Sequence, residues 1–179
     1  MSLSKSLLLG ATVFVIMIVT NVVYATVSTT SIAVTPAEIS TLATVAAIDK
    51  NEILLGDIAL HKKITPGIAA LAQLMIDQHG ANLTQILEMA NQLHALPLIS
   101  TTAMELTAEG NKAMVTLGAL QGKQFDQAYV NAMVSGHEDA LKLIDQHLMK
   151  TAQSPEIKKF MMDTRAAVVM HLAAAKKLQ

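Results

Sequence analysis

The sequence predicts an all-α protein whose domain, residues 35–179, is an antiparallel bundle of about four helices with a small extra helix in the second connection. Three observations predict this fold. The 179 residues are 52% hydrophobic but only 3% aromatic, and this aliphatic composition favours helices. Apolar residues recur at three- and four-residue spacing, as on the buried face of a helix. Helix-start signals recur at Thr35-Pro36, Thr65-Pro66 and Ser154-Pro155, where a hydroxyl residue precedes a proline.

The N-terminal residues 1–25 have the pattern of an export signal. Lys5 supplies a short positive region, Leu7 to Val23 is an almost unbroken apolar run, and Val23-Tyr24-Ala25 places small residues at a cleavage site. We therefore expect an exported protein, periplasmic or associated with the outer membrane. The alternative is that the uncleaved apolar run anchors the chain in a membrane. The Ser/Thr/Val-rich residues 26–34 are expected to form a flexible leader.

The composition of the mature chain excludes several classes of function. It contains no Cys, so disulfides, thiol catalysis and a lipid anchor on cysteine are excluded. A net charge of -1 and the absence of Trp argue against nucleic acid as a partner. After Ala25, charged residues, Gln or His recur every few positions, so we expect no membrane span in the mature chain. The sequence identifies no protein partner.

The helices are expected in the following order. The first begins at a capping box formed by Thr35 and Glu38. Pro97 ends the second and opens a longer connection. Short breaks near residues 64 and 152 make two antiparallel hairpins. The expected ranges are 35–63, 66–94, 107–120 for the additional helical segment, 125–151 and 154–177.

Four polar residues fall on the apolar stripes of these helices, one on each main helix: Glu52, His79, His137 and His171. At 1.5 Å of rise per residue, all four lie roughly 18 to 28 Å from the hairpin turns, and therefore at about one level of the bundle. Imidazole and carboxylate groups suit zinc, iron and copper, so the four residues form a candidate site for a single metal ion.

The same pattern has two other interpretations. The buried polar groups can hydrogen-bond to one another and stabilise a purely structural or interaction bundle. Alternatively, a metal-dependent oxidoreductase would use the site with an open coordination position, reached past Gly80 or Gly136. No serine triad or phosphate loop supports another enzyme class, and the sequence favours a protein without enzymatic activity.

Other polar residues carry weaker signals. Three histidines near helix C-termini are expected to complement the helix dipole, and several acidic residues beside the stripes are expected to be solvated or to support a ligand from behind. The eleven Met residues are expected to fill the core rather than to store copper. The histidines are His61, His94 and His147, and the acidic residues are Asp49, Asp77, Glu138 and Asp139.

Three stretches resemble a known family of exported bacterial proteins, the domain of unknown function 4142. They are residues 74–79 (LMIDQH), residues 125–138 with the Phe-Asp-x-x-Tyr motif, and residues 171–175 (HLAAA). The resemblance implies a ferritin-like four-helix bundle, described as a predicted outer-membrane or periplasmic protein with no settled activity. It also implies that the family's recurring Glu and His positions fall on Glu52, His79, His137 and His171.

The sequence departs from true ferritins at the positions that would carry a di-iron site. Such sites need Glu-x-x-His on two helices, but the residues three before the candidate histidines are Ile76, Val134 and Val168. The pattern therefore argues against ferroxidase chemistry.

Overall fold

A computed structural model describes residues 34–179, which belong to one compact unit. The expected signal peptide, residues 1–25, and the expected leader up to residue 33 lie outside the described residues. Among the helices of residues 34–179, none combines the length and the apolar character needed to cross a bilayer.

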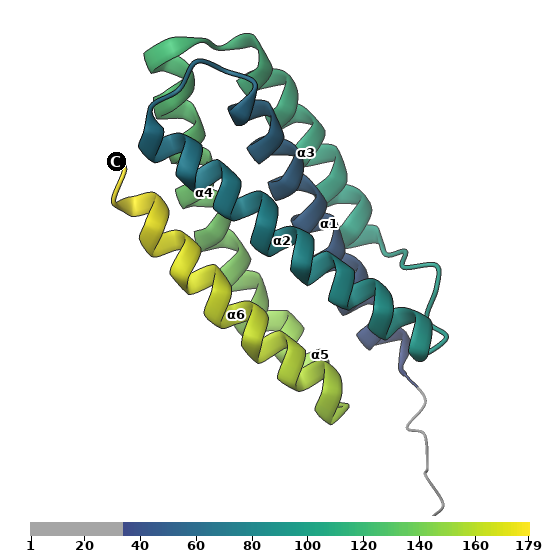
Figure 1. Ribbon diagram of the computed structural model, residues 1–179. Coiled ribbons are helices and arrows are strands. Elements are labelled where there is room, and N and C mark those ends of the chain that lie inside the picture. The colour runs from purple at the N-terminus through teal and green to yellow at the C-terminus, as the bar shows by residue number, and fades with distance from the viewer. Residues whose placement is uncertain (1–33) are drawn as a thin grey trace, which may run out of the picture. The chain divides into compact units, whose positions relative to one another are not determined.

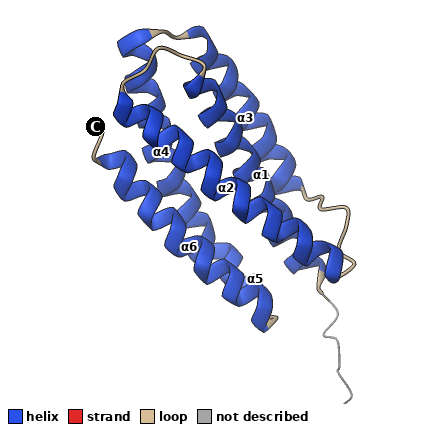
Figure 2. Cartoon of the chain, viewed as in Figure 1, coloured by secondary structure: helices blue, strands red, loops and turns tan. Residues whose placement is uncertain are grey.

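The described part of the chain is helical and contains no strand (Figures 1 and 2). Helix α1 packs against α2 and α3, and α4 packs against α6. A π-helical turn and α5 extend α4, so the third expected helix of the bundle runs on to Thr151. The elements are α1 (Pro36–Leu60), α2 (Pro66–Gln92), α3 (Thr101–Ala119), α4 (Gly122–Leu143), the π-helix η1 (Ile144–Leu148), α5 (Met149–Thr151) and α6 (Pro155–Lys176).

Two of the three proline-marked starts use the expected side-chain caps. The Thr35 hydroxyl accepts from the amide of Glu38, and the Glu38 carboxylate accepts from the Thr35 amide, so α1 begins with a complete capping box. Thr65 Oγ1 caps α2 through the amide of Ile68. At α6 the Ser154 side chain makes no capping bond. Instead Glu38 Oε1 accepts from the Ser154 amide at 2.7 Å, so one carboxylate serves two helix starts.

The additional helix differs from the expectation of a small element. Helix α3 has 19 residues and begins six residues earlier than predicted, at Thr101. The Ser100 hydroxyl accepts from the amide of Ala103 and caps its start. Helix α3 packs against α1, and such tertiary packing stabilises a helix beyond what its own sequence does.

The core contains two large apolar regions separated by a polar layer, and a smaller apolar cluster between α1 and α3. One region contains Leu42 from α1, Ile86 from α2 and Phe160 from α6. The other contains Leu55 from α1 and Phe125 from α4. Between them along the helices lie buried polar side chains, and their shared level agrees with the height expected from helix geometry. These polar residues are Asp49, Glu52, His79, His137 and His171.

Candidate metal centre

Three of the four predicted site residues form a compact cluster. His79 comes from α2, His137 from α4 and His171 from α6, and all three side chains are buried. One potential ligand nitrogen from each ring lies within 4.8 Å of the other two. The ring centroids are 4.9 to 5.7 Å apart. Three helices distant in sequence thus bring their imidazoles to one point.

Each imidazole has a hydrogen-bond contact through one of its two ring nitrogens. His79 Nδ1 lies 2.8 Å from Asp49 Oδ1. His137 Nδ1 donates to the carbonyl oxygen of Met133 at 2.7 Å, and His171 Nε2 lies 2.7 Å from Gln78 Oε1. Because a carbonyl oxygen can only accept, the proton of the neutral His137 ring is on Nδ1 and its Nε2 carries a lone pair.

The second nitrogen of each ring is buried and unpartnered. His79 Nε2, His137 Nε2 and His171 Nδ1 have no hydrogen-bond partner among residues 34–179. Buried polar atoms in proteins almost always find a partner, so three neighbouring exceptions need a physical explanation. Three imidazole nitrogens, each on a ring oriented by another contact, form a donor set for a metal ion.

Burial keeps these rings in the form that can bind a cation. It lowers the pKa of His79 to about 4. Burial, followed by the nearby charge of His79, lowers the pKa of His137 to about 4, although the Met133 carbonyl opposes the shift. Burial also lowers the pKa of His171 to about 3, with contributions from the other two rings. All three rings are therefore neutral at pH 7, as metal ligation requires.

Asp49, which contacts His79, is itself part of a chain of hydrogen bonds. Its Oδ2 accepts from Asn82 Nδ2 at 2.9 Å, and Asn82 Oδ1 accepts from the Thr164 hydroxyl at 3.2 Å. Burial raises the pKa of Asp49 to about 8, and the Asn82 amide opposes this shift. Burial therefore favours the protonated form of this carboxyl group. A cation bound at His79 Nε2 would favour release of that proton, because the resulting carboxylate stabilises the ligating ring.

Glu52, the fourth predicted residue, lies in the same buried layer but outside the group of mutually close ligand atoms. Its Oε2 has no hydrogen-bond partner in the described part of the chain. Burial, together with the nearby Asp49, raises its pKa to about 8. The hydroxyl of Tyr129 is also unpartnered within residues 34–179, and burial and Glu52 raise its pKa. Glu52 Oε2 and the Tyr129 hydroxyl are therefore two further buried polar atoms without partners among residues 34–179.

The positions of the remaining polar residues agree in part with those expected from the sequence. His61 is the C-cap of α1, with its Nδ1 2.8 Å from the Asp57 carbonyl oxygen. Asp77 and Asp139 are exposed, as expected for solvated groups. Of the four acidic residues beside the apolar stripes, Asp49 is the one whose carboxyl group contacts a candidate ligand, His79. Its position three residues before Glu52, on the same helix face, is the signal that marks it as inward.

Gln78 and Asn82 are functional partners that sequence reasoning missed. Gln78 precedes His79 and is exposed, yet its side chain reaches His171 on another helix. Asn82 is three residues after His79 and contacts both Asp49 and Thr164. Neither contact follows from helical periodicity, because both depend on how separate helices pack.

A family model described as Domain of unknown function (DUF4142) matches residues 25–178. No curated protein and no solved structure gives a significant match to the chain. The matched range includes all three clustered histidines and their partners Asp49, Met133 and Gln78. The chain therefore belongs to this family of unknown function.

Proposed function

We propose that this chain is an exported, ferritin-like helical-bundle protein that binds one transition-metal ion through His79, His137 and His171. The ligand atoms are Nε2, Nε2 and Nδ1, respectively. Glu52, expected from the sequence as the fourth ligand, has an unpartnered carboxylate oxygen in the same buried layer and would complete the coordination after a side-chain movement. Imidazole and carboxylate ligands are compatible with zinc, iron or copper.

The observation that carries the proposal is the pairing pattern of the three rings. Each ring uses one nitrogen for a hydrogen-bond contact and leaves the other buried and without a partner within residues 34–179. This is the arrangement of metal-binding histidines, whose second nitrogen usually donates to a carboxylate or carbonyl oxygen. A purely structural network would be expected to satisfy the inward nitrogens as well.

The spacing also supports binding. Three atoms within 4.8 Å of one another lie within about 2.8 Å of a common centre, whereas zinc–nitrogen bonds are 2.0–2.1 Å long. Closing the difference requires movements of less than about 1 Å for each ring. Such adjustments are within the reach of side-chain torsions.

A metal-dependent oxidoreductase is the second candidate function. Three protein ligands leave a coordination position free, as in catalytic zinc sites, and a cavity of about 320 Å³ adjoins Glu52. Turnover of a redox substrate that depends on the bound metal would favour this function over metal binding alone. The absence of Glu-x-x-His from the three histidine-bearing helices argues against di-iron chemistry.

The test is metal titration of the full chain after metal removal. Co²⁺ is the probe, because its visible absorption reports coordination by imidazole nitrogen. We expect one equivalent of Co²⁺ to bind to the wild type. In His137→Ala the affinity should fall by more than about tenfold, because loss of a residue that only supports a ligand already weakens metal binding tenfold or more. Metal analysis of protein purified without chelator or affinity tag would then identify the native ion.

His61→Ala is the matched control, because it removes an exposed histidine from the end of a helix. It should bind Co²⁺ like the wild type. Absence of binding to the wild type, or equal binding by His137→Ala, would contradict the proposal and leave the cluster as core structure.

A further inference from the structure

A cavity between α1, α3 and α4 reaches the buried layer that contains the histidines. It has a volume of about 320 Å³ and largely apolar walls, including Leu55, Leu106 and Ala132. Three carboxylate residues line it, Glu52, Glu109 and Asp139, whereas no Lys, Arg or His of residues 34–179 does so. The ionisable groups that line the cavity itself are therefore all acidic residues.

Glu52 forms the inner end of this cavity. Its side chain is 8% exposed, and its Oε2 has no partner within the described residues. Its Oε1 faces exposed Gly136, since a Cβ added to this glycine would lie 3.6 Å from that oxygen. The cavity is thus lined by a buried carboxylate whose second oxygen has no partner within residues 34–179.

The same carboxylate borders the histidine cluster. Asp49, one helical turn earlier on α1, contacts His79. Gly136, which faces Glu52, directly precedes His137. Glu52 is therefore one turn from the residue that contacts His79, and it faces the residue that precedes His137.

Contacts between α1 and α3 determine the mouth of the cavity. Asn51 Nδ2 donates to the Leu106 carbonyl oxygen at 2.8 Å, and the Asn51 side chain occupies the space that a Cβ on Gly110 would need. This close approach holds Glu109, the neighbour of Gly110, at the rim. Asp139 is paired with Lys142 at 2.8 Å, so Glu109 is the rim carboxylate without an ion pair among residues 34–179.

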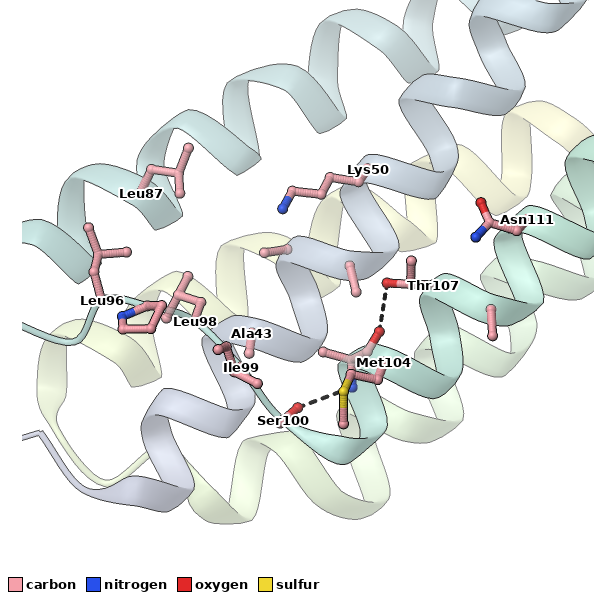
Figure 3. Close-up of a pocket in the computed structure, with 15 residues that line it drawn as sticks. Ala43, Lys50, Leu87, Leu96, Leu98, Ile99, Ser100, Met104, Thr107 and Asn111 are labelled. Carbon is pink, nitrogen blue, oxygen red and sulfur yellow. Dashed lines mark hydrogen bonds between the residues drawn. The ribbon is translucent and has the colours of Figure 1, made fainter.

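A larger cavity of about 590 Å³ lies on another face and provides a contrast (Figure 3). Its lining includes Leu87, Leu98 and Met104, and its one charged residue is Lys50. None of the clustered histidines or their supporting residues lines it. Its charge would repel a cation, and its position does not connect it to the polar layer.

We propose that the cavity between α1, α3 and α4 is the entry route for the metal cation, and that Glu52 passes the ion to the histidines. Glu109 raises the local concentration of cations at the rim. The Glu52 carboxylate binds the ion first, at the inner end of the route, and the three neutral imidazoles then replace its hydration shell. This inference rests on the proposed metal-binding function.

Stopped-flow mixing of the metal-free full chain with Co²⁺ tests the route separately from the site. Glu109→Gln should slow uptake by about threefold at low ionic strength, and the effect should shrink as salt is added. Gly136→Leu should slow uptake by about tenfold or more, because its side chain extends into the cavity toward Glu52. The equilibrium affinity of Glu109→Gln should stay within about twofold of the wild-type value, since Glu109 is not a ligand.

Two control variants make the same kinds of substitution, a Glu to Gln and a small residue to Leu, in other cavities. Glu88→Gln removes a carboxylate that lines a different cavity, between α2 and α6. Ala108→Leu adds a leucine to the lining of the larger cavity. Both should take up Co²⁺ at the wild-type rate. Circular dichroism checks that every variant is folded.

The outcomes separate the route from the site. Wild-type uptake rates in both Glu109→Gln and folded Gly136→Leu would overturn the entry route while leaving the metal site intact. Failure of the wild type to bind Co²⁺ would instead overturn the proposed function and the route together.

Discussion

Two buried polar regions of this protein differ in how completely their polar atoms are satisfied. Glu38, near the start of α1, uses both carboxylate oxygens: Oε1 accepts from the amides of Gln153 and Ser154, and Oε2 accepts from Thr35. In the histidine layer, three ring nitrogens and Glu52 Oε2 have no partner within residues 34–179. The first arrangement is complete without a ligand, whereas the second is not.

The pKa values show the same contrast. Burial would raise the pKa of Glu38, but hydrogen bonds from Ser154 and Thr35 outweigh it and lower the pKa to about 2. For Glu52, burial and Asp49 act in the same direction and raise the pKa to about 8. A buried carboxylate supplied with donors contributes to stability, while one without donors costs stability until something binds it.

The largest expected effect is stabilisation of the histidine layer by metal. At a free metal concentration 1,000 times the dissociation constant, binding adds about 4 kcal/mol to the free energy of unfolding. For a chain of this length, that corresponds to a rise in Tm on the order of 10 °C. Calorimetry of the wild type with and without Zn²⁺ measures it. An equal rise in His137→Ala would place the binding elsewhere.

The next largest effect is expected at Glu38. Glu38→Gln should lower the free energy of unfolding by about 2 kcal/mol, because charge-assisted hydrogen bonds to two helix starts are weakened. Urea denaturation measures this loss, which should be the same with and without metal. Glu105→Gln, at an exposed position of α3, is the control. A Glu38→Gln variant as stable as this control would show that the cap contributes little.

Replacing a clustered histidine by an apolar residue should have the opposite effect on the metal-free protein. His171→Leu should raise its free energy of unfolding by about 1 kcal/mol, since a buried imidazole with an unpartnered nitrogen is removed. Its partner Gln78 is exposed, so water can replace the lost hydrogen bond. The same variant should lose stabilisation by Zn²⁺. A loss of metal-free stability would indicate that the nitrogen is already satisfied in solution.

The stability of the metal-free protein should also change with pH. The raised pKa values of Asp49 and Glu52, about 8 for both, mean that the folded state keeps protons that the unfolded state loses. Stability should therefore fall as the pH rises from 6.5 to 8, by on the order of 3 kcal/mol for the two groups together. The lowered histidine pKa values act below pH 6.5, where protonation favours the unfolded state and stability falls as the pH drops.

Denaturant titrations of the metal-free protein from pH 5 to 8 test this dependence. Glu52→Gln should show a smaller decline above pH 6.5, because it removes one of the two titrating carboxyl groups. Metal affinity should rise over the same range, since binding releases protons. A flat profile in the wild type, or an unchanged decline in Glu52→Gln, would argue against the protonated layer.

Local sequence signals predicted the helices because the interactions concerned are local. Thr35 and Glu38 form a capping box within one turn, and the prolines at residues 36, 66 and 155 occupy first helical positions. Met161 is buried and Met162 is 55% exposed, as expected for neighbours on a helix that cannot both face inward. The start of α3 was missed because the Ser100 cap follows Pro97 in a stretch without strong periodicity.

Helical periodicity and the rise per residue by themselves identified His79, His137, His171 and Glu52 as inward residues at one level, because both depend only on spacing along the chain. The tertiary structure decided which nitrogen of each ring is left unpartnered, and it brought Asp49 to His79 and Gln78 to His171. It also placed Glu52 at the end of a cavity between three helices. Such contacts depend on the rotation and separation of packed helices, which spacing within a single helix does not encode.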